Sequence, residues 1–135
     1  MDYSTGYVKM CEGALELQRR WGVFAGDLFF EKGTSYATIA GVSDGAVSLV
    51  DERTMSDVVN GVFKKSKSVW LPRQDQMQEM LEITKPREAA TLINEFLEGE
   101  EKAGGYRCRS MEQAWLAIVM RRMYGSAWDG QKWAG

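Results

Sequence analysis

The chain contains no histidine, and its 135 residues include only two cysteines and two prolines. Without imidazole, the commonest general base and the commonest nitrogen ligand for metals are both missing. Cys11 and Cys108 lie far apart, without the paired short spacing of a zinc site or a redox motif. We therefore expect no metal, no cofactor and no enzymatic activity, although mechanisms that use carboxylates, lysine or magnesium remain open.

Long apolar runs and an excess of positive charge are also missing. No apolar stretch approaches the ~18 residues that a membrane span requires, and no segment resembles a signal peptide. Lys and Arg number 17 against 19 Asp and Glu, a formal net charge of -2. No global positive field therefore draws the chain to phosphate backbones or anionic membranes. We expect a cytoplasmic protein with no membrane partner, in which any nucleic-acid contact depends on a local patch.

The remaining composition is that of one globular domain. A hydrophobic content of 44% with 11% aromatic residues is enough to bury a core in a chain of 135 residues. No internal repeat, low-complexity tract or composition boundary divides the sequence. We therefore expect a single domain that spans residues 1–135.

The spacing of apolar residues in the first half predicts one helix followed by strands. Residues 7–21 have helical spacing, whereas residues 54–61 fit either a short helix, a loop or a hairpin closed by Asn60-Gly61. Bulky apolar segments separated by turn residues are typical of strands. We expect such strands at residues 28–30, 35–42, 46–50, 62–63 and 69–71, with a polar hairpin tip at residues 64–68. Together they predict an antiparallel meander of four to five strands.

In the second half of the sequence, apolar residues recur with the period of an α-helix. Pro72 suits the first turn of a helix that reaches Leu81, and Pro86 suits the first turn of the next. Ser110 and Gln113 have the spacing of a capping box, and they begin a helix that ends near Gly125. We expect an α+β fold with an N-terminal helix and three C-terminal helices packed on one face of the sheet. The buried face of the last helix is expected to carry Met111, Ala114, Trp115, Ile118, Val119 and Met123.

Several segments resemble a family of small, uncharacterised proteins encoded by phages and prophages of Gram-positive bacteria. The resemblance implies a phage origin and a shared fold, and it supplies no reaction, cofactor or catalytic residue. Residues 35–67 follow the family pattern only loosely. The segments that carry it are Tyr7-Val8-Lys9-Met10-Cys11-Glu12, Glu16-Leu17-Gln18, Trp21, Gly26-Asp27, residues 69–81, Ser110-Met111-Glu112-Gln113-Ala114-Trp115 and Trp128-Asp129-Gly130.

Two places are candidate sites for binding a partner protein. At the strand-to-helix junction, Trp70, Arg73, Gln74 and Asp75 are expected to be held firmly, as a binding surface requires. The alternative is that Asp75 only stabilises the positive end of the helix dipole. Near the C-terminus, Trp128 and Trp133 flank Asp129-Gly130, so a tight turn could fold both indoles against the body or present them to a partner.

A local basic patch is the alternative site. Lys64, Lys65, Lys67 and Arg73 could neutralise phosphates while Phe63 or Trp70 stacks on a base. Lysines at a hairpin tip also blunt an exposed sheet edge without any ligand. A third hypothesis assigns Asp75 and Glu79, one helical turn apart, to a magnesium ion or to acid and base catalysis.

These observations favour a non-enzymatic phage accessory protein that binds a host or phage protein, including a host or defence component that it inhibits. The alternative is a nucleic-acid or nucleotide-binding protein of the phage replication region. Wide apolar helix faces also predict a homodimer, because one small sheet cannot cover all of them.

Overall fold

The computed structural model describes residues 1–32, 37–43, 46–51 and 63–135. The chain forms two compact units, Tyr3–Pro72 and Met1–Asp2 with Arg73–Gly135. The expectation of a single domain remains a prediction. The α+β class is confirmed, because the first unit carries a sheet with two helices and the second carries three helices with a short hairpin.

The N-terminal helical segment is two helices and not one. Helix α1 (Thr5–Gly13) begins at Ser4, whose hydroxyl accepts a hydrogen bond from the backbone N–H of Tyr7 at 3.1 Å, and α2 (Leu15–Arg20) follows. Ala14 interrupts the helix with φ -81° and ψ 68°. Leu15, the first residue of α2, is 56% exposed.

A four-stranded antiparallel sheet forms the rest of this unit. Its strands are β1 (Leu28–Glu31), β2 (Ala37–Ser43), β3 (Ala46–Asp51) and β4 (Ser68–Leu71), in the order β3-β2-β1-β4. The predicted meander of four to five strands is therefore wrong. Only β1, β2 and β3 are consecutive neighbours, and β4 returns to the other edge of β1, with Leu28 opposite Leu71.

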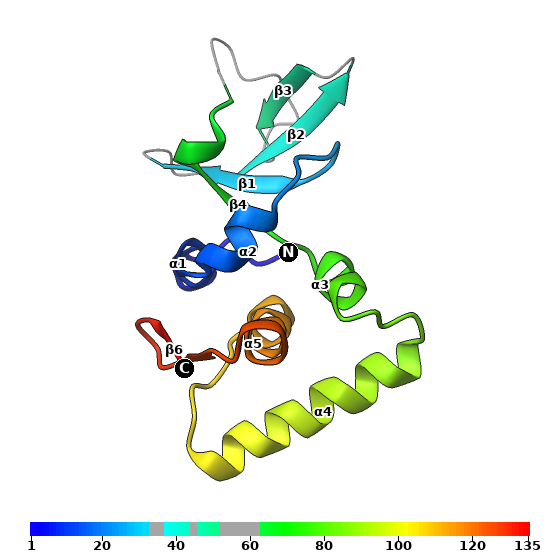
Figure 1. The fold of residues 1–135 in the computed structure, drawn as a ribbon, viewed down its shortest axis with the longest axis vertical. Coiled ribbons are helices and arrows are strands. Elements are labelled where there is room, and N and C mark those ends of the chain that lie inside the picture. The colour runs from blue at the N-terminus through cyan, green and yellow to red at the C-terminus, as the bar shows by residue number, and fades with distance from the viewer. Residues whose placement is uncertain (33–36, 44–45, 52–62) are drawn as a thin grey trace. The chain divides into compact units, whose positions relative to one another are not determined.

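The segment before β4 also differs from its prediction. A 3-10 turn, η1 (Lys65–Lys67), replaces the hairpin tip, and Phe63 lies outside any strand. The predicted short helix, loop or hairpin at residues 54–61 lies outside the described residues. Helix α1 packs on the sheet through β4 (Figure 1). It carries Tyr7, Met10 and Cys11, all fully buried.

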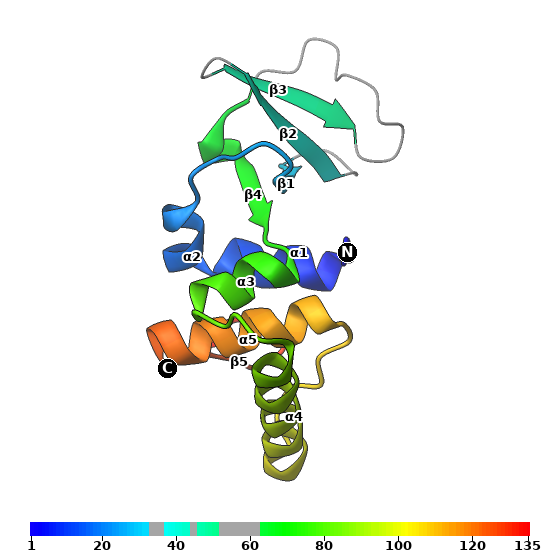
Figure 2. The ribbon, with the colours of Figure 1, turned by 90° about the vertical axis from the view of Figure 1, so that its right-hand side faces the viewer.

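The three helices of the second unit are α3 (Gln74–Met80), α4 (Pro86–Ala103) and α5 (Met111–Tyr124). Both α3 and α4 contact α5, on different sides of it (Figure 2). The expected packing of these helices on the sheet would join the two units, and it remains a prediction. Helix α3 begins at Gln74 and not at Pro72, whereas Pro86 does stand in the first turn of α4.

Helix α5 begins and ends where its sequence predicted. The Ser110 hydroxyl accepts a hydrogen bond from the Gln113 backbone N–H at 3.1 Å, and Gly125 ends the helix with φ 66°. The second hydrogen bond of the expected capping box has a different donor. The Gln113 side chain accepts it from the backbone N–H of Arg109 and not from that of Ser110. Met111, expected on the buried face, is 43% exposed because it is the first residue of the helix.

A two-stranded hairpin follows α5, formed by β5 (Ala127–Trp128) and β6 (Trp133–Ala134). Its strands pair Trp128 with Trp133. In the described part of the chain, no helix has the length and apolar character needed to cross a membrane.

Candidate partner-binding site

Trp70 lies inside the first unit. It is 5% exposed and stacks on Trp21, with ring centroids 6.1 Å apart and an interplanar angle of 2°. Its indole nitrogen, buried, has no hydrogen-bond partner among the described residues. A role for Trp70 in partner binding remains a prediction, although burial leaves this side chain little surface to offer.

Arg73, Gln74 and Asp75 open the second unit, at the start of α3. The Arg73 backbone N–H donates to the Gln76 side chain at 2.9 Å, and its guanidinium Nε donates to the Asp75 carboxylate at 3.1 Å. Asp75 is in the first turn, where the helix dipole favours a carboxylate. The predicted junction site is therefore divided between the two units, because Trp70 belongs to the other.

The carboxylates proposed for catalysis are on the surface of α3. The side chain of Asp75 is 71% exposed and is paired with Arg73, and Glu79 is also exposed. Among the described residues, no three His, Cys, Asp or Glu side chains gather closely enough to hold a metal ion. The catalytic hypothesis gains no support from this arrangement.

The basic segment before β4 is fully on the surface. Lys64, Lys65 and Lys67 are all exposed, around the η1 turn. The turn is held because Ser68 donates its hydroxyl to the Lys64 carbonyl at 2.8 Å and Lys32 donates its backbone N–H to the Lys67 carbonyl at 2.9 Å. The fourth predicted cation, Arg73, lies in the other unit.

The aromatic side chain expected to stack on a base next to these lysines packs inward. The Phe63 ring makes edge contacts with Trp21 and Phe29, with centroids 5.7 and 5.3 Å away. These rings, together with Trp70, form the aromatic part of the core of this unit. Trp70 is 5% exposed, so it offers little ring surface for a base to stack on.

A shallow hollow of about 390 Å³ lies between α2 and η1 in the same unit, and we call it the α2–η1 hollow. Leu15 and Trp21 supply apolar atoms, and Arg19 and Lys65 supply the charges. None of the described residues that line it is acidic. The lining residues are Leu15, Gln18, Arg19, Trp21, Lys65, Ser66 and Ser68.

The loop between α2 and β1 presents an aromatic side chain that sequence reasoning missed. The Asp27 carboxylate is 1% exposed and accepts hydrogen bonds from the Trp21 indole at 2.9 Å and from the Phe24 backbone at 3.0 Å. The Gly26 N–H donates to the Ala40 carbonyl at 2.7 Å, and Ala40 donates back to Asp27 at 2.8 Å.

Although the loop is held at both ends, the Phe24 side chain is 71% exposed. A sequence signal for this loop existed, because an aspartate three residues after Phe24 can bond back to that residue's backbone N–H.

The rings of the two C-terminal tryptophans pack mainly against residues of their own unit. Trp128 is 8% exposed and lies 5.1 Å from Trp133 and 6.5 Å from Tyr106, centroid to centroid. The predicted tight turn is present, because one oxygen of Asp129 accepts from the backbone N–H groups of Gln131 and Lys132. Both bonds lower the pKa of Asp129, and the bond from Lys132 has the larger effect. The partner role of Trp128 and Trp133 remains a prediction.

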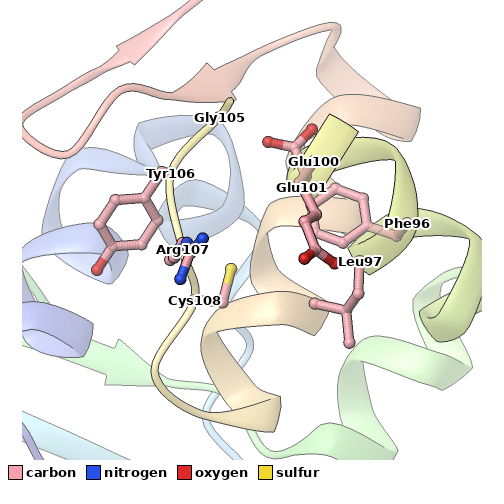
Figure 3. Close-up of a pocket in the computed structure, with 8 residues that line it drawn as sticks. All are labelled: Phe96, Leu97, Glu100, Glu101, Gly105, Tyr106, Arg107 and Cys108. Carbon is pink, nitrogen blue, oxygen red and sulfur yellow. The ribbon is translucent and has the colours of Figure 1, made fainter. Parts of the chain in front are cut away.

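A second hollow, of about 270 Å³, lies between the C-terminal half of α4 and residues 105–108 (Figure 3). Glu100 lines it and pairs with Arg121 at 2.7 Å, and the Arg121 guanidinium stands 5.3 Å from the centre of the Phe96 ring. Burial, together with the charge of Glu100, raises the pKa of the Cys108 thiol to about 11. Cys108 is therefore a protonated, weakly nucleophilic thiol at neutral pH.

Together, the described residues define a small α+β protein with exposed apolar and basic side chains. Comparison with known proteins finds no matching family model, no matching curated protein and no matching solved structure.

Proposed function

We propose that this chain is a non-enzymatic, phage-encoded accessory protein of the bacterial cytoplasm that acts by binding another protein. Its target is a host or defence component that the phage restrains. The phage setting rests on the resemblance of the sequence segments described above. The surface of the first unit supports the binding role, and the lack of histidine is in keeping with it.

The observation that carries this proposal is the exposure of Phe24 on a loop held by buried hydrogen bonds. A phenylalanine that moves from water into an apolar pocket contributes about 2 kcal/mol. Because Asp27 and Ala40 already fix the loop, little conformational entropy is lost when a partner closes over the ring. Aromatic side chains, phenylalanine among them, are enriched at protein interfaces.

Affinity capture from phage-infected host cells, with mass spectrometry of the bound proteins, tests the proposal. The wild-type chain is compared with Phe24→Ser and with the matched control Met111→Ser, which removes an exposed apolar side chain from the other unit. We expect a partner that the wild type and the control retain and that Phe24→Ser loses about tenfold. Equal recovery by all three chains, or no specific partner, would refute the proposal.

Nucleic-acid binding is the second candidate, favoured by the exposure of Lys64, Lys65 and Lys67 within one turn. Three phosphate contacts would make the affinity fall steeply with added salt. Gel shifts with single-stranded and double-stranded DNA at low salt test this, with the double variant Lys64→Gln/Lys67→Gln as the comparison. Absence of any shift with either form eliminates the candidate.

A further inference from the structure

The charged side chains that line the α2–η1 hollow are all positive. Arg19 and Lys65 are exposed at its edge, Lys64 and Lys67 flank Lys65 on the surface, and none of the described residues that line the hollow is acidic. Leu15 adds an aliphatic side chain that is 56% exposed. The chemistry that complements this surface is an apolar side chain with carboxylates beside it.

The C-terminal end of α4 carries that chemistry. Leu97 is 38% exposed, and Glu98 and Glu101 are both on the surface. Leu97 and Glu101 are four residues apart, so they lie on the same side of the helix. Glu100 differs from them, because its side chain is 17% exposed and pairs with Arg121. Figure 3 shows Leu97, Glu100 and Glu101 projecting from this part of the helix.

The stability of α4 itself does not explain why these carboxylates stand at its C-terminal end. The helix dipole favours cations there and disfavours anions. Lys102 is the one basic residue in the last turn. In the described part of the chain, Glu98 and Glu101 form no ion pair. Cations from outside the helix would offset this unfavourable charge.

We propose that the protein self-associates by placing the acidic end of α4 of one copy in the α2–η1 hollow of a second copy. Leu97 packs against Leu15, and Glu98 and Glu101 face Arg19 and Lys65. One such contact joins two copies, and a second contact, related to the first by a two-fold axis, would close the dimer. This contact does not involve Phe24, so it stands apart from the partner-binding proposal.

Sedimentation of the full chain over a concentration series tests the proposal by charge reversal. We expect a dimer at low ionic strength that dissociates as salt is added, because the contact is charged and partly exposed. Lys65→Glu and Glu101→Lys should each raise the dimer dissociation constant about tenfold. The double variant Lys65→Glu/Glu101→Lys restores attraction with the charges exchanged, and its dissociation constant should return to within about threefold of wild type.

Matched controls make the same charge changes elsewhere, with Lys132→Glu for Lys65→Glu and Glu79→Lys for Glu101→Lys, both at exposed positions. They should leave the dissociation constant unchanged, and circular dichroism confirms that every variant is folded. A strict monomer at high concentration overturns the proposal. So does a double variant that is as weak as the two single changes combined, because it would show that the two positions do not meet.

Discussion

The side-chain amide of Gln18 hydrogen-bonds both backbone groups of Trp70, although 52 residues separate them. Its nitrogen donates to the Trp70 carbonyl at 3.0 Å, and its oxygen accepts from the Trp70 N–H at 2.8 Å. Because β4 is an edge strand, these groups would otherwise be unpaired. Gln18 thus takes the place of a neighbouring strand, and the same nitrogen also donates to the Cys11 carbonyl at 3.0 Å.

Replacing Gln18 should destabilise the first unit more than an exposed substitution does. Gln18→Ala removes three hydrogen bonds and leaves the Trp70 N–H and carbonyl without their partner. We expect a loss of about 2–3 kcal/mol in the free energy of unfolding. Urea denaturation measures it, with Glu16→Ala as the control at an exposed position of the same helix. Equal stability of the two variants would contradict this role for Gln18.

Asp27 should be needed for the conformation of the loop that carries Phe24. Asp27→Ala leaves the Trp21 indole and the Phe24 N–H without their acceptor, and we expect a cost of about 2–4 kcal/mol. Asp27→Asn keeps one acceptor oxygen and should retain most of the stability. Unfolding followed by tryptophan fluorescence compares the two. If Asn were as damaging as Ala, the carboxylate charge and not its hydrogen bonding would be responsible.

The thiol of Cys108 should react slowly with a disulfide reagent in the native protein. Its pKa of about 11 keeps the thiolate fraction small at neutral pH, while Cys11 is fully buried. Burial is the larger cause of that pKa and Glu100 the smaller, so Glu100→Gln should accelerate the reaction moderately at mildly alkaline pH. The initial rate of thiol titration against pH measures both effects. A rate equal to that of an unfolded control would contradict the prediction.

The same thiol should make stability depend on alkaline pH. The pKa of Cys108 in the folded chain, about 11, lies above its ordinary value of 9.0, so the unfolded chain loses this proton first. Below pH 9.0 the thiol is protonated in both states, and the free energy of unfolding is at its full value. As the pH rises from 9.0 toward about 11, deprotonation of the unfolded chain lowers that free energy. Cys108→Ser, a hydroxyl that does not titrate in this range, should reduce that dependence. Denaturant midpoints at several pH values provide the measurement.

Asp129 should make the C-terminal hairpin sensitive to acid. Hydrogen bonds from Lys132 and Gln131 lower its pKa in the folded state. The stabilising contribution is therefore present above the ordinary pKa of 3.8 and is lost as the pH falls through the lowered value. Near-ultraviolet circular dichroism of the Trp128–Trp133 pair follows the loss. Asp129→Ala should show the acid spectrum already at neutral pH, whereas Asp129→Asn keeps an acceptor and should not.

The amino-acid sequence alone specifies the elements that depend on local chemistry. Ser110 and Gly125 bound α5 because a hydroxyl cap and a left-handed glycine act within one turn of the backbone. Pro86 begins α4 in the same local way, and Asp129-Gly130 marks the turn that pairs Trp128 with Trp133. The α+β class followed from the change between helical and alternating periods along the chain.

Other features depend on partners distant in sequence, so they are set only when the chain folds. The break at Ala14 coincides with the bonds from Gln18 to Cys11 and Trp70, and no helical period predicts a bond across 52 residues. The pairing of β4 with β1 in place of a meander likewise depends on contacts distant in sequence.

The same distinction between local and long-range causes applies to the residues of the candidate surfaces. Lys64, Lys65 and Lys67 were predicted as surface cations, because charged side chains seldom bury. By contrast, burial of Trp70 and Trp128 and exposure of Phe24 depend on which neighbours surround each ring, and that is a property of the folded chain.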